Sequence, residues 1–290
     1  MISIITPTYN RAYLLPRMIK SVLEQSFQDW ELIIMDDGST DATETVVKGF
    51  NDSRIKYYFT ENSGAADKRN RGSEIAKGDY IILLDSDDEV KSNWLAAFAK
   101  EIKDGAQVVC CGMEKYNEKG ELVKVKLPFK HSSLYKSIEG YFLSGTFLLK
   151  KNYFLTIGGY DTNLASGHHT DFLLRLIPYL QKEKVNISNI MDYLVKIHIH
   201  KGAKIRSNNK AVLDGTLEIL KKHRVLFENN KEDYKNFLSV AGTHALILRE
   251  RSLGKKLLLR AYFLTPFNLK SLGRMLLAFT PVINTKFWNK

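Results

Sequence analysis

The chain has 290 residues, of which 44% are hydrophobic and 26% charged, as in an ordinary soluble globular protein. This composition excludes a disordered chain, and no apolar run approaches the roughly 20 residues that a membrane-spanning helix needs. The two cysteines, Cys110 and Cys111, are neighbours in an apolar run, so they define neither a disulfide framework nor a metal site. No signal peptide is expected before the first apolar run, and a reducing cytoplasm is the expected location.

The net charge of +11 is concentrated near the C-terminus. Residues 210–290 contain 15 Lys and Arg against 6 Asp and Glu, so this segment carries +9 and residues 1–209 only +2. From Arg251 onward there are 8 basic residues and no acidic one. Such asymmetry predicts an anionic partner, either a membrane surface or nucleic acid, while a solvated basic face is the plainer alternative.

Short apolar runs alternate with helical patterns over the first 110 residues. The predicted strands are Ile2–Thr6, Glu31–Met35, Ile55–Phe59, Tyr80–Leu84 and Gln107–Cys111. The predicted helices between them are Tyr13–Gln25, Ala42–Phe50, Ala65–Ala76 and Trp94–Ile102. This alternation predicts an α/β fold with a mostly parallel, Rossmann-like sheet and helices on both faces.

The elements become more varied after residue 110. The sequence predicts a hairpin in Met113–Lys126, a helix at Ser137–Leu143, a strand at Thr146–Lys150, a helix at Asp171–Leu180 and a strand at Tyr193–His200. After Asn209 the pattern is helical and rich in lysine. We therefore expect a main domain at residues 1–208, with halves at 1–110 and 111–208, and a basic helical appendage at 209–290.

The stretch Ile81–Glu89 places three carboxylates directly after a buried strand: Asp85, Asp87 and Asp88. Ligands of open α/β sheets bind at the carboxyl ends of strands. Clustered carboxylates, which all carry negative charge and offer oxygen ligands, are suited to binding a hard divalent cation. The alternative is an acidic turn that caps the helix beginning near Ser92.

Three further polar loops follow the other predicted strands at the same edge. Tyr9 can stack on a base, and Arg11 can approach a phosphate or the base edge. In the second loop, one acidic residue can cap the next helix. Asp37 is then available to accept a hydrogen bond from a ribose or from a base N–H. In the third loop, Lys68 and Arg69 place positive charge near a phosphate-bearing ligand. The chain contains no Gly-rich phosphate loop, so a diphosphate would depend on a metal ion.

Four motifs in this order and spacing resemble those of family 2 glycosyltransferases of the GT-A fold, which build bacterial cell-surface polysaccharides. The motifs are Pro-Thr-Tyr-Asn-Arg11, Asp-Asp-Gly-Ser-Thr-Asp41, Asn-x-Gly…Arg-Asn-x-Gly72 and Leu-Asp-Ser-Asp-Asp88. The resemblance implies an Asp-x-Asp motif at Asp85 and Asp87, with Mn²⁺ or Mg²⁺ as cofactor. The residues expected to bind the donor are Pro7, Tyr9, Arg11, Asp37, Lys68, Arg69, Asp85 and Ser86.

The half of the domain expected to bind the acceptor departs from the family pattern. Gly158-Gly-Tyr-Asp161 resembles the family's turn under the acceptor site. Counting back from Arg175, the position of the usual catalytic Asp holds His169, and a second acidic position holds Asp171. An imidazole near neutrality suits proton abstraction, so we expect His169 to be the base. Asp171 is the alternative base, or it orients His169, or it only caps the helix.

Two histidines, His198 and His200, alternate on one face of the last predicted strand. We expect His200 to reach the metal or the diphosphate, and a purely structural histidine is the alternative. In the tail, an apolar helical face lies opposite a basic one, which predicts an amphipathic helix at an anionic membrane interface or ordinary packing. The apolar face comprises Leu269, Leu272, Leu276 and Phe279, and the basic face Lys270 and Arg274.

The resemblance implies an inverting, metal-dependent transfer of a hexosyl or N-acetylhexosaminyl group from a nucleoside-diphosphate donor, and UDP-sugars are the expected donors. The expected acceptor is a saccharide or a polyprenyl-linked saccharide, with the enzyme peripheral at the inner face of the cytoplasmic membrane. A catalytically silent sugar-nucleotide binder is the first alternative. A nucleic-acid-binding protein that uses the basic tail is the second, and we expect no nucleic acid partner.

Overall fold

The computed structural model describes residues 1–200, 208–266 and 268–280, which fall into two compact units. The first unit contains Met1–His131, Ser137–Asp161 and the chain from Arg175 through strand β11 (Ile187–His198). The second contains Ser132–Lys136, Thr162–Leu174 and the described tail from residue 208. The second unit thus includes two short segments from the expected main domain, and the boundary at residues 208–209 stays a prediction.

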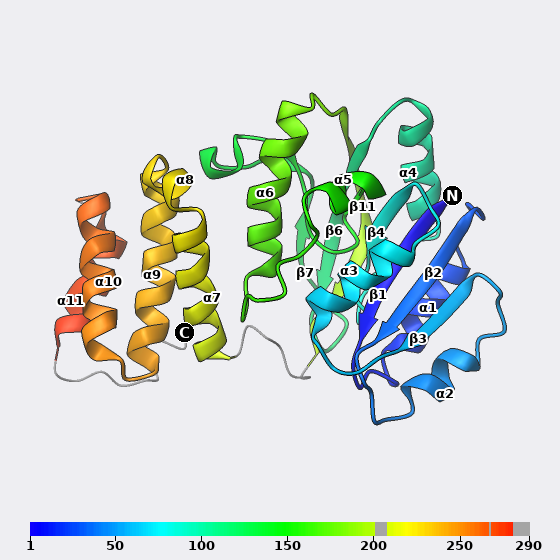
Figure 1. The fold of residues 1–290 in the computed structure, drawn as a ribbon, viewed down its shortest axis with the longest axis horizontal. Helices are drawn as coiled ribbons and strands as arrows, with labels where there is room; N and C mark the ends of the chain where they lie inside the picture. The colour runs from blue at the N-terminus through cyan, green and yellow to red at the C-terminus, as the bar shows by residue number, and fades with distance from the viewer. Residues whose placement is uncertain (201–207, 267, 281–290) are drawn as a thin grey trace. The chain divides into compact units, whose positions relative to one another are not determined.

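A nine-stranded sheet forms the centre of the first unit (Figure 1). Its order is β3-β2-β1-β4-β10-β6-β11-β5, with β7 paired to β6. The pairs β1–β2, β1–β4, β2–β3 and β6–β11 are parallel, whereas β10, β5 and β7 run antiparallel to their neighbours. The strands other than β11 are β1 Ile2–Thr8, β2 Trp30–Asp36, β3 Ile55–Phe59, β4 Tyr80–Leu83, β5 Glu89–Val90, β6 Val108–Tyr116, β7 Leu122–Lys126 and β10 Phe147–Lys150.

Helices cover both faces of this sheet, as the β-α alternation predicted. One apolar core lies between the sheet and helices α1 (Leu15–Leu23), α2 (Thr43–Lys48) and α4 (Trp94–Lys103). Helices α3 (Ala65–Ile75) and α5 (Lys151–Thr156) contact each other and the sheet. Because both faces are covered, the central strands are rich in apolar residues, and every residue of β1 and β2 is buried.

Helix α3 lies unusually close to the sheet because Gly72 has no side chain. A Cβ atom at this position would lie 2.5 Å from Ile5 Cγ2 and 3.1 Å from Met35 Cγ. The glycine therefore determines both the distance between α3 and the sheet and the rotation of α3 about its own axis. This matters for the site, because the residues just before Gly72 point toward it.

The structure confirms the predicted hairpin and strand but not the helix between them. The hairpin is β6–β7 around Asn117, and β10 takes the place of the strand Thr146–Lys150. The helix predicted at Ser137–Leu143 is wrong, since this segment is irregular apart from the short strand β9 (Glu139–Gly140), which pairs with β8 (Phe129–Lys130). Thr146 Oγ1 accepts the backbone N–H of Leu143 and contacts Tyr141 O at 2.7 Å, so a side chain satisfies the backbone instead of a helix.

The second unit is helical and has its own core. Its tail comprises α7 (Asn209–Lys222), α8 (Arg224–Glu228), α9 (Lys231–Ile247), α10 (Arg251–Leu264) and α11 (Leu269–Phe279). Leu134 in the short helix η1 (Ser133–Tyr135), Leu164 and Leu174 belong to the same apolar core as these helices. Helix α6 (His168–Lys182) begins in this unit and continues into the first. Among the residues that the structure describes, no helix has the length and apolar character needed to cross a membrane.

We expect Gly72→Ala to lower the free energy of unfolding of the first unit by about 1–3 kcal/mol, because the added methyl group overpacks the α3–β1 contact. Urea unfolding followed by tryptophan fluorescence measures this, since Trp30 and Trp94 are both buried there. Gly273→Ala in α11 is the control, because its Cβ would meet nothing within 4 Å. Equal midpoints for Gly72→Ala and the unmodified chain would contradict the packing argument.

Candidate active site

Four loops meet at the carboxyl edge of the sheet, after β1, β2, β3 and β4, and backbone contacts join them. The N–H of Asp37 donates to Thr8 O at 2.9 Å, and the N–H of Leu84 donates to Ile5 O at 3.0 Å. Asn10, which has a left-handed backbone (φ 51°), accepts the N–H of Thr40 at 2.8 Å through its side chain. The parallel register therefore brings all four motif loops together.

Asp36 and Asp37 organise these loops from their buried positions. Asp36 accepts the hydroxyl of Tyr57 at 2.6 Å, and burial together with this carboxylate raises the pKa of Tyr57. Asp37 accepts the N–H groups of Ser63 at 2.7 Å and Gly64 at 3.0 Å. These N–H groups lie at the start of α3, where a carboxylate is favoured by the helix dipole.

Lys68 completes the arrangement around Asp37. Its side chain is fully buried, and its ammonium lies 3.2 Å from Asp37 and 3.2 Å from Asp67. It also donates to Glu61 O at 2.8 Å. With Ser63 Oγ at 2.5 Å, the buried ammonium has four oxygen partners and holds the loop in place, so this placement favours a positioning role for Lys68 over direct contact with a donor.

Successive residues of α3 connect three parts of the first unit. Arg69 Nη2 donates to Asp85 Oδ1 at 2.6 Å and lies over the ring of Tyr160 at 5.6 Å. Asn70 donates to Tyr160 O and accepts the Tyr160 N–H, both at 2.8 Å. Burial raises the pKa of Tyr160 to about 12. Helix α3 therefore positions the Asp-x-Asp loop and the Gly-Gly-Tyr-Asp turn at the same time.

The Gly-Gly-Tyr-Asp turn needs its glycines. Gly158 and Gly159 have φ values of 77° and 59°, in the left-handed region that L-residues rarely adopt. A Cβ at Gly159 would lie 2.4 Å from Asn70 Oδ1. Arg175 fixes the turn from α6 by donating to Gly159 O at 2.6 Å.

The three carboxylates after β4 lie together. One oxygen from each of Asp85, Asp87 and Asp88 lies within 4.8 Å of the others. Asp88 is almost fully buried, and burial together with Asp85 and Asp87 raises its pKa well above the usual range. An oxygen-rich cluster of this kind can accommodate a divalent cation.

His200 and Arg11 lie beside this cluster. His200 Nε2 is 2.5 Å from Asp87 Oδ2, and Arg11 Nη1 is 3.2 Å from the same ring nitrogen. The structure thus brings His200, predicted from a His-x-His pattern, to the carboxylate predicted to hold metal. Tyr9 is half-exposed on the adjoining loop, Pro7 is buried within β1, and Ser86 is buried between Asp85 and Asp87.

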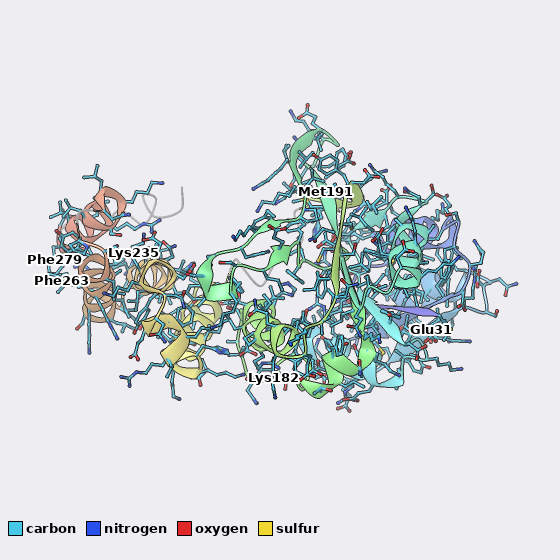
Figure 2. The ribbon with its side chains drawn as sticks, turned by 90° about the horizontal axis from the view of Figure 1, so that it is seen from above. Glu31, Lys182, Met191, Lys235, Phe263 and Phe279 are labelled. Atoms are coloured by element: carbon cyan, nitrogen blue, oxygen red, sulfur yellow. The ribbon has the colours of Figure 1, made fainter. Side chains whose placement is uncertain are left out.

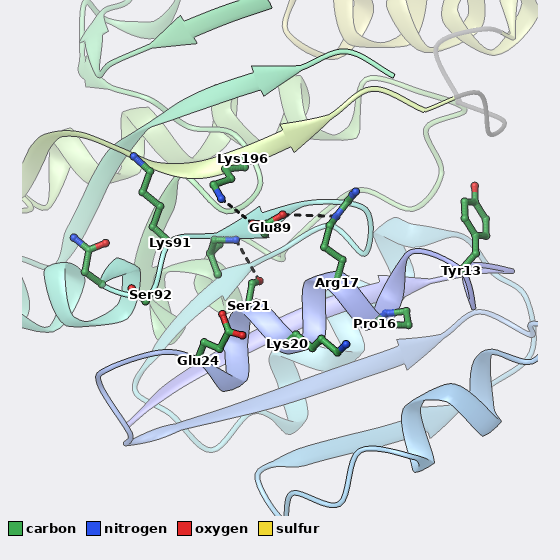
Figure 3. A pocket seen from close by; sticks show the side chains of 12 residues that line it. Tyr13, Pro16, Arg17, Lys20, Ser21, Glu24, Glu89, Lys91, Ser92 and Lys196 are labelled. Atoms are coloured by element: carbon green, nitrogen blue, oxygen red, sulfur yellow. Dashed lines mark hydrogen bonds and ion pairs between the residues drawn. The ribbon is translucent and has the colours of Figure 1, made fainter. Parts of the chain in front are cut away.

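Arg17 of α1 supports the loop after β4 and pairs with Glu89 (Figure 3). Arg17 Nη2 donates to the backbone oxygen of Asp87 at 2.6 Å, and its Nε lies 3.9 Å from Glu89. Glu89 also pairs with Lys196 at 2.8 Å and with His198 at 3.3 Å. Burial alone would raise the pKa of Glu89, but Lys196 and the other cations lower it overall. Arg17 therefore links the metal-site loop to an ion-pair network on β5 and β11.

The predicted base residues lie at the start of α6, in the second unit. Asp171 is fully buried, and its carboxylate lies 2.9 Å from Lys222 Nζ and 2.8 Å from His223 Nε2, at the end of α7. His169 is half-buried, with its ring 6.3 Å from that of Phe172. The pairing of Asp171 favours a positioning role, and the role of His169 as base stays a prediction.

Several residues of the site were not predicted from the sequence. Arg17, Asn70 and Tyr57 contact the motif loops, while Lys222 and His223 contact Asp171. Asn70 belongs to the Arg-Asn-x-Gly motif, and this motif is the one sequence signal that could have identified any of these residues. The other four carry no local pattern that identifies a partner.

The fold and the acidic strand end define a sugar-nucleotide-dependent glycosyltransferase of the GT-A class. A sequence profile described as Glycosyl transferase family 2 matches residues 3–163, and the chain belongs to this family. The putative colanic acid biosynthesis glycosyl transferase WcaA of Escherichia coli K12 is 30% identical over 256 residues, which cover 82% of this chain and 86% of WcaA.

One further relative and one solved structure are similar over different extents. The E. coli UDP-Glc:alpha-D-GlcNAc-diphosphoundecaprenol beta-1,3-glucosyltransferase WfgD is 45% identical over 89 residues, or 30% of this chain and 35% of WfgD. The crystal structure of S. aureus TarS 1–349 with UDP-GlcNAc superposes with a TM-score of 0.65 at 20% identity. That alignment covers 91% of this chain and 81% of TarS 1–349, and it confirms the GT-A fold.

We expect Lys68→Met to lower the free energy of unfolding by about 3–5 kcal/mol, because it leaves the Asp37 carboxylate buried without its counter-charge. Urea unfolding measures the loss. Lys48→Met is the matched control, since the exposed Lys48–Glu44 pair should contribute less than about 1 kcal/mol. Similar small losses for both variants would show that Lys68 is not structurally required.

Proposed function

We propose that the chain is an inverting glycosyltransferase that moves a hexosyl or N-acetylhexosaminyl group from a UDP-sugar to a polyprenyl-linked saccharide. The observation that carries the proposal is the cluster of Asp85, Asp87 and Asp88 at the carboxyl end of β4, beside three other motif loops. WfgD, a UDP-Glc-dependent glucosyltransferase, and the TarS complex with UDP-GlcNAc support a UDP-sugar donor, and the diphosphoundecaprenol-linked substrate of WfgD supports a lipid-linked acceptor. The enzyme would then act peripherally at the inner face of the cytoplasmic membrane.

In this proposal the four loops bind the nucleotide. The half-exposed Tyr9 ring stacks on the base, and Asp37 lies beside the nucleotide, where it accepts the N–H groups of Ser63 and Gly64 and so fixes the loop before α3. Arg11 and Arg69 approach the diphosphate, and Asp85 and Ser86 lie at the ribose. Pro7 and Lys68 support these contacts from buried positions.

The residues present fit a divalent cation. Asp87 is the principal ligand that we propose, with Asp85 and His200 next to it, because Arg69 already holds one oxygen of Asp85. An imidazole ligand favours Mn²⁺ over Mg²⁺, which prefers an all-oxygen shell. When bound, the cation neutralises negative charge on the departing diphosphate. Arg17 keeps the Asp87 backbone in position for this role.

We propose that His169 deprotonates the acceptor hydroxyl, which then attacks the anomeric carbon of the donor. A neutral imidazole accepts this proton readily near neutral pH. Asp171 is proposed to fix the start of α6 through Lys222 and His223, so that it places His169 without taking the proton itself.

Asp87→Asn is expected to weaken Mn²⁺-dependent UDP binding and UDP release by about a hundredfold or more, because it removes the principal charged ligand. Calorimetry with UDP, with and without Mn²⁺, and a UDP-release assay over several UDP-sugars provide the readouts. Asp104→Asn, an exposed carboxylate at the end of α4, is the control. Unchanged Mn²⁺ dependence in Asp87→Asn would remove this residue from the metal site. UDP binding without release from any donor would favour the silent sugar-nucleotide binder.

His169→Ala is expected to lower kcat by roughly 10²- to 10⁴-fold with an unchanged melting temperature, as loss of a general base does. Asp171→Asn should instead lower the melting temperature, because Lys222 and His223 lose their buried counter-charge. Paired kcat and thermal-unfolding measurements distinguish the two roles. The assignment is reversed if His169→Ala retains full turnover while Asp171→Asn loses it without loss of stability.

A further inference from the structure

The last two described helices carry large apolar side chains on their outer side. We call these the α10–α11 ridge: Leu259, Phe263, Leu269, Leu276 and Phe279. Leu269 is 81% exposed, Phe263 68%, Leu276 56% and Phe279 53%. Single exposed apolar residues are ordinary, but a group of five on two neighbouring helices marks an interaction surface.

The ridge is separate from the faces that pack in the unit. Leu257, Leu258 and Ala261 of α10 are buried, and α10 makes extensive contact with α9. Ala278 of α11 is buried together with Leu258. Leu259 and Phe263, four residues apart, therefore share the side of α10 that points away from this core. The packing needs of both helices are met without the ridge.

The two helices present the ridge as one surface. Lys255 Nζ, near the start of α10, lies 5.0 Å from the ring centroid of Phe279, at the end of α11. The helices therefore run antiparallel, so that Leu269 lies toward the end of α10, where Phe263 stands. In Figure 2, Phe263 and Phe279 lie at the same outer edge, and Lys235 of α9 lies further inside.

The charged residues of the two helices that form the ridge have a single sign. Residues 251–280 contain six basic residues and no acidic one. Lys270 and Arg274 are exposed on α11, on the opposite flank from the apolar residues, and Lys256 and Arg260 are exposed on α10. A helix pair with apolar side chains on one side, whose own charged residues are all basic, suits the boundary between acyl chains and anionic headgroups.

We propose that the α10–α11 ridge docks the second unit on an anionic lipid leaflet, with its leucines and phenylalanines among the acyl chains and its basic residues at the phosphates. The proposal extends the proposed function, since a polyprenyl-linked acceptor lies in a membrane. Lipid binding can nevertheless be measured without any glycosyl transfer, so the two proposals can fail separately.

The same observations argue against two other occupants. A second copy bound through this ridge by a two-fold axis would bring the same basic residues face to face. Nucleic acid would use the basic side chains but offers no place for exposed leucines, because its surface is charged and its bases stack on aromatic rings. A lipid leaflet satisfies both the apolar and the basic part of the surface.

The experiment is vesicle co-sedimentation of the full chain. The probes are vesicles of phosphatidylcholine alone and vesicles with one third phosphatidylglycerol, each at low and high salt. We expect binding to the anionic vesicles that weakens with salt. The double variant Phe263→Gln, Leu276→Gln should lose about tenfold or more in affinity. Lys270→Gln, Arg274→Gln should lose roughly fivefold per charge on anionic vesicles alone.

Val225→Gln is the matched control, because Val225 of α8 is 72% exposed but lies outside the ridge. It should bind like the unmodified chain, and circular dichroism should show equal helix content in all variants. The proposal is overturned if the unmodified chain does not bind anionic vesicles, or if Val225→Gln weakens binding as much as the ridge variant. Ridge-dependent dimerisation in sedimentation velocity without vesicle binding would also overturn it, in favour of a second copy.

Discussion

The crowding of Asp85, Asp87 and Asp88 at the end of β4 is the constraint on which the rest of the first unit depends. Three carboxylates with oxygens within 4.8 Å of one another repel, and one of them is almost fully buried. Arg69 approaches from α3, and Arg17 approaches from α1 on the other face of the sheet. Helices on both faces of the sheet thus contribute positive charge around the loop that follows β4.

The β-α alternation and the four motif loops were predictable because they rest on local patterns. Apolar runs, turn residues and acidic strand ends lie within a few positions of each other along the chain. The contacts that complete the site are not local. Asn70 meets Tyr160 across 90 residues, and Asp171 meets His223 across 52. Such pairs depend on the packing of distant elements, for which one sequence contains no direct signal.

The tail illustrates the same limit. Its helices and its basic character were predicted from periodicity and charge, but its contacts were not. In the structure, Lys222 and His223 lie against Asp171, and Leu164 and Leu174 share one apolar core with the tail. The segment that carries His169 therefore owes its conformation to residues that follow it by about fifty positions.

The contacts of α3 have a consequence for how the chain can vary in length. Arg69, Asn70 and Gly72 each face a different neighbour, and Gly72 admits no other rotation of the helix against Ile5. An insertion or deletion of one residue between Gly64 and Gly72 would turn the helix by about 100° and misdirect the others. Changes of length in this family should therefore fall before Gly64 or after Ile75, and a grafted loop should join the chain at one of these two points.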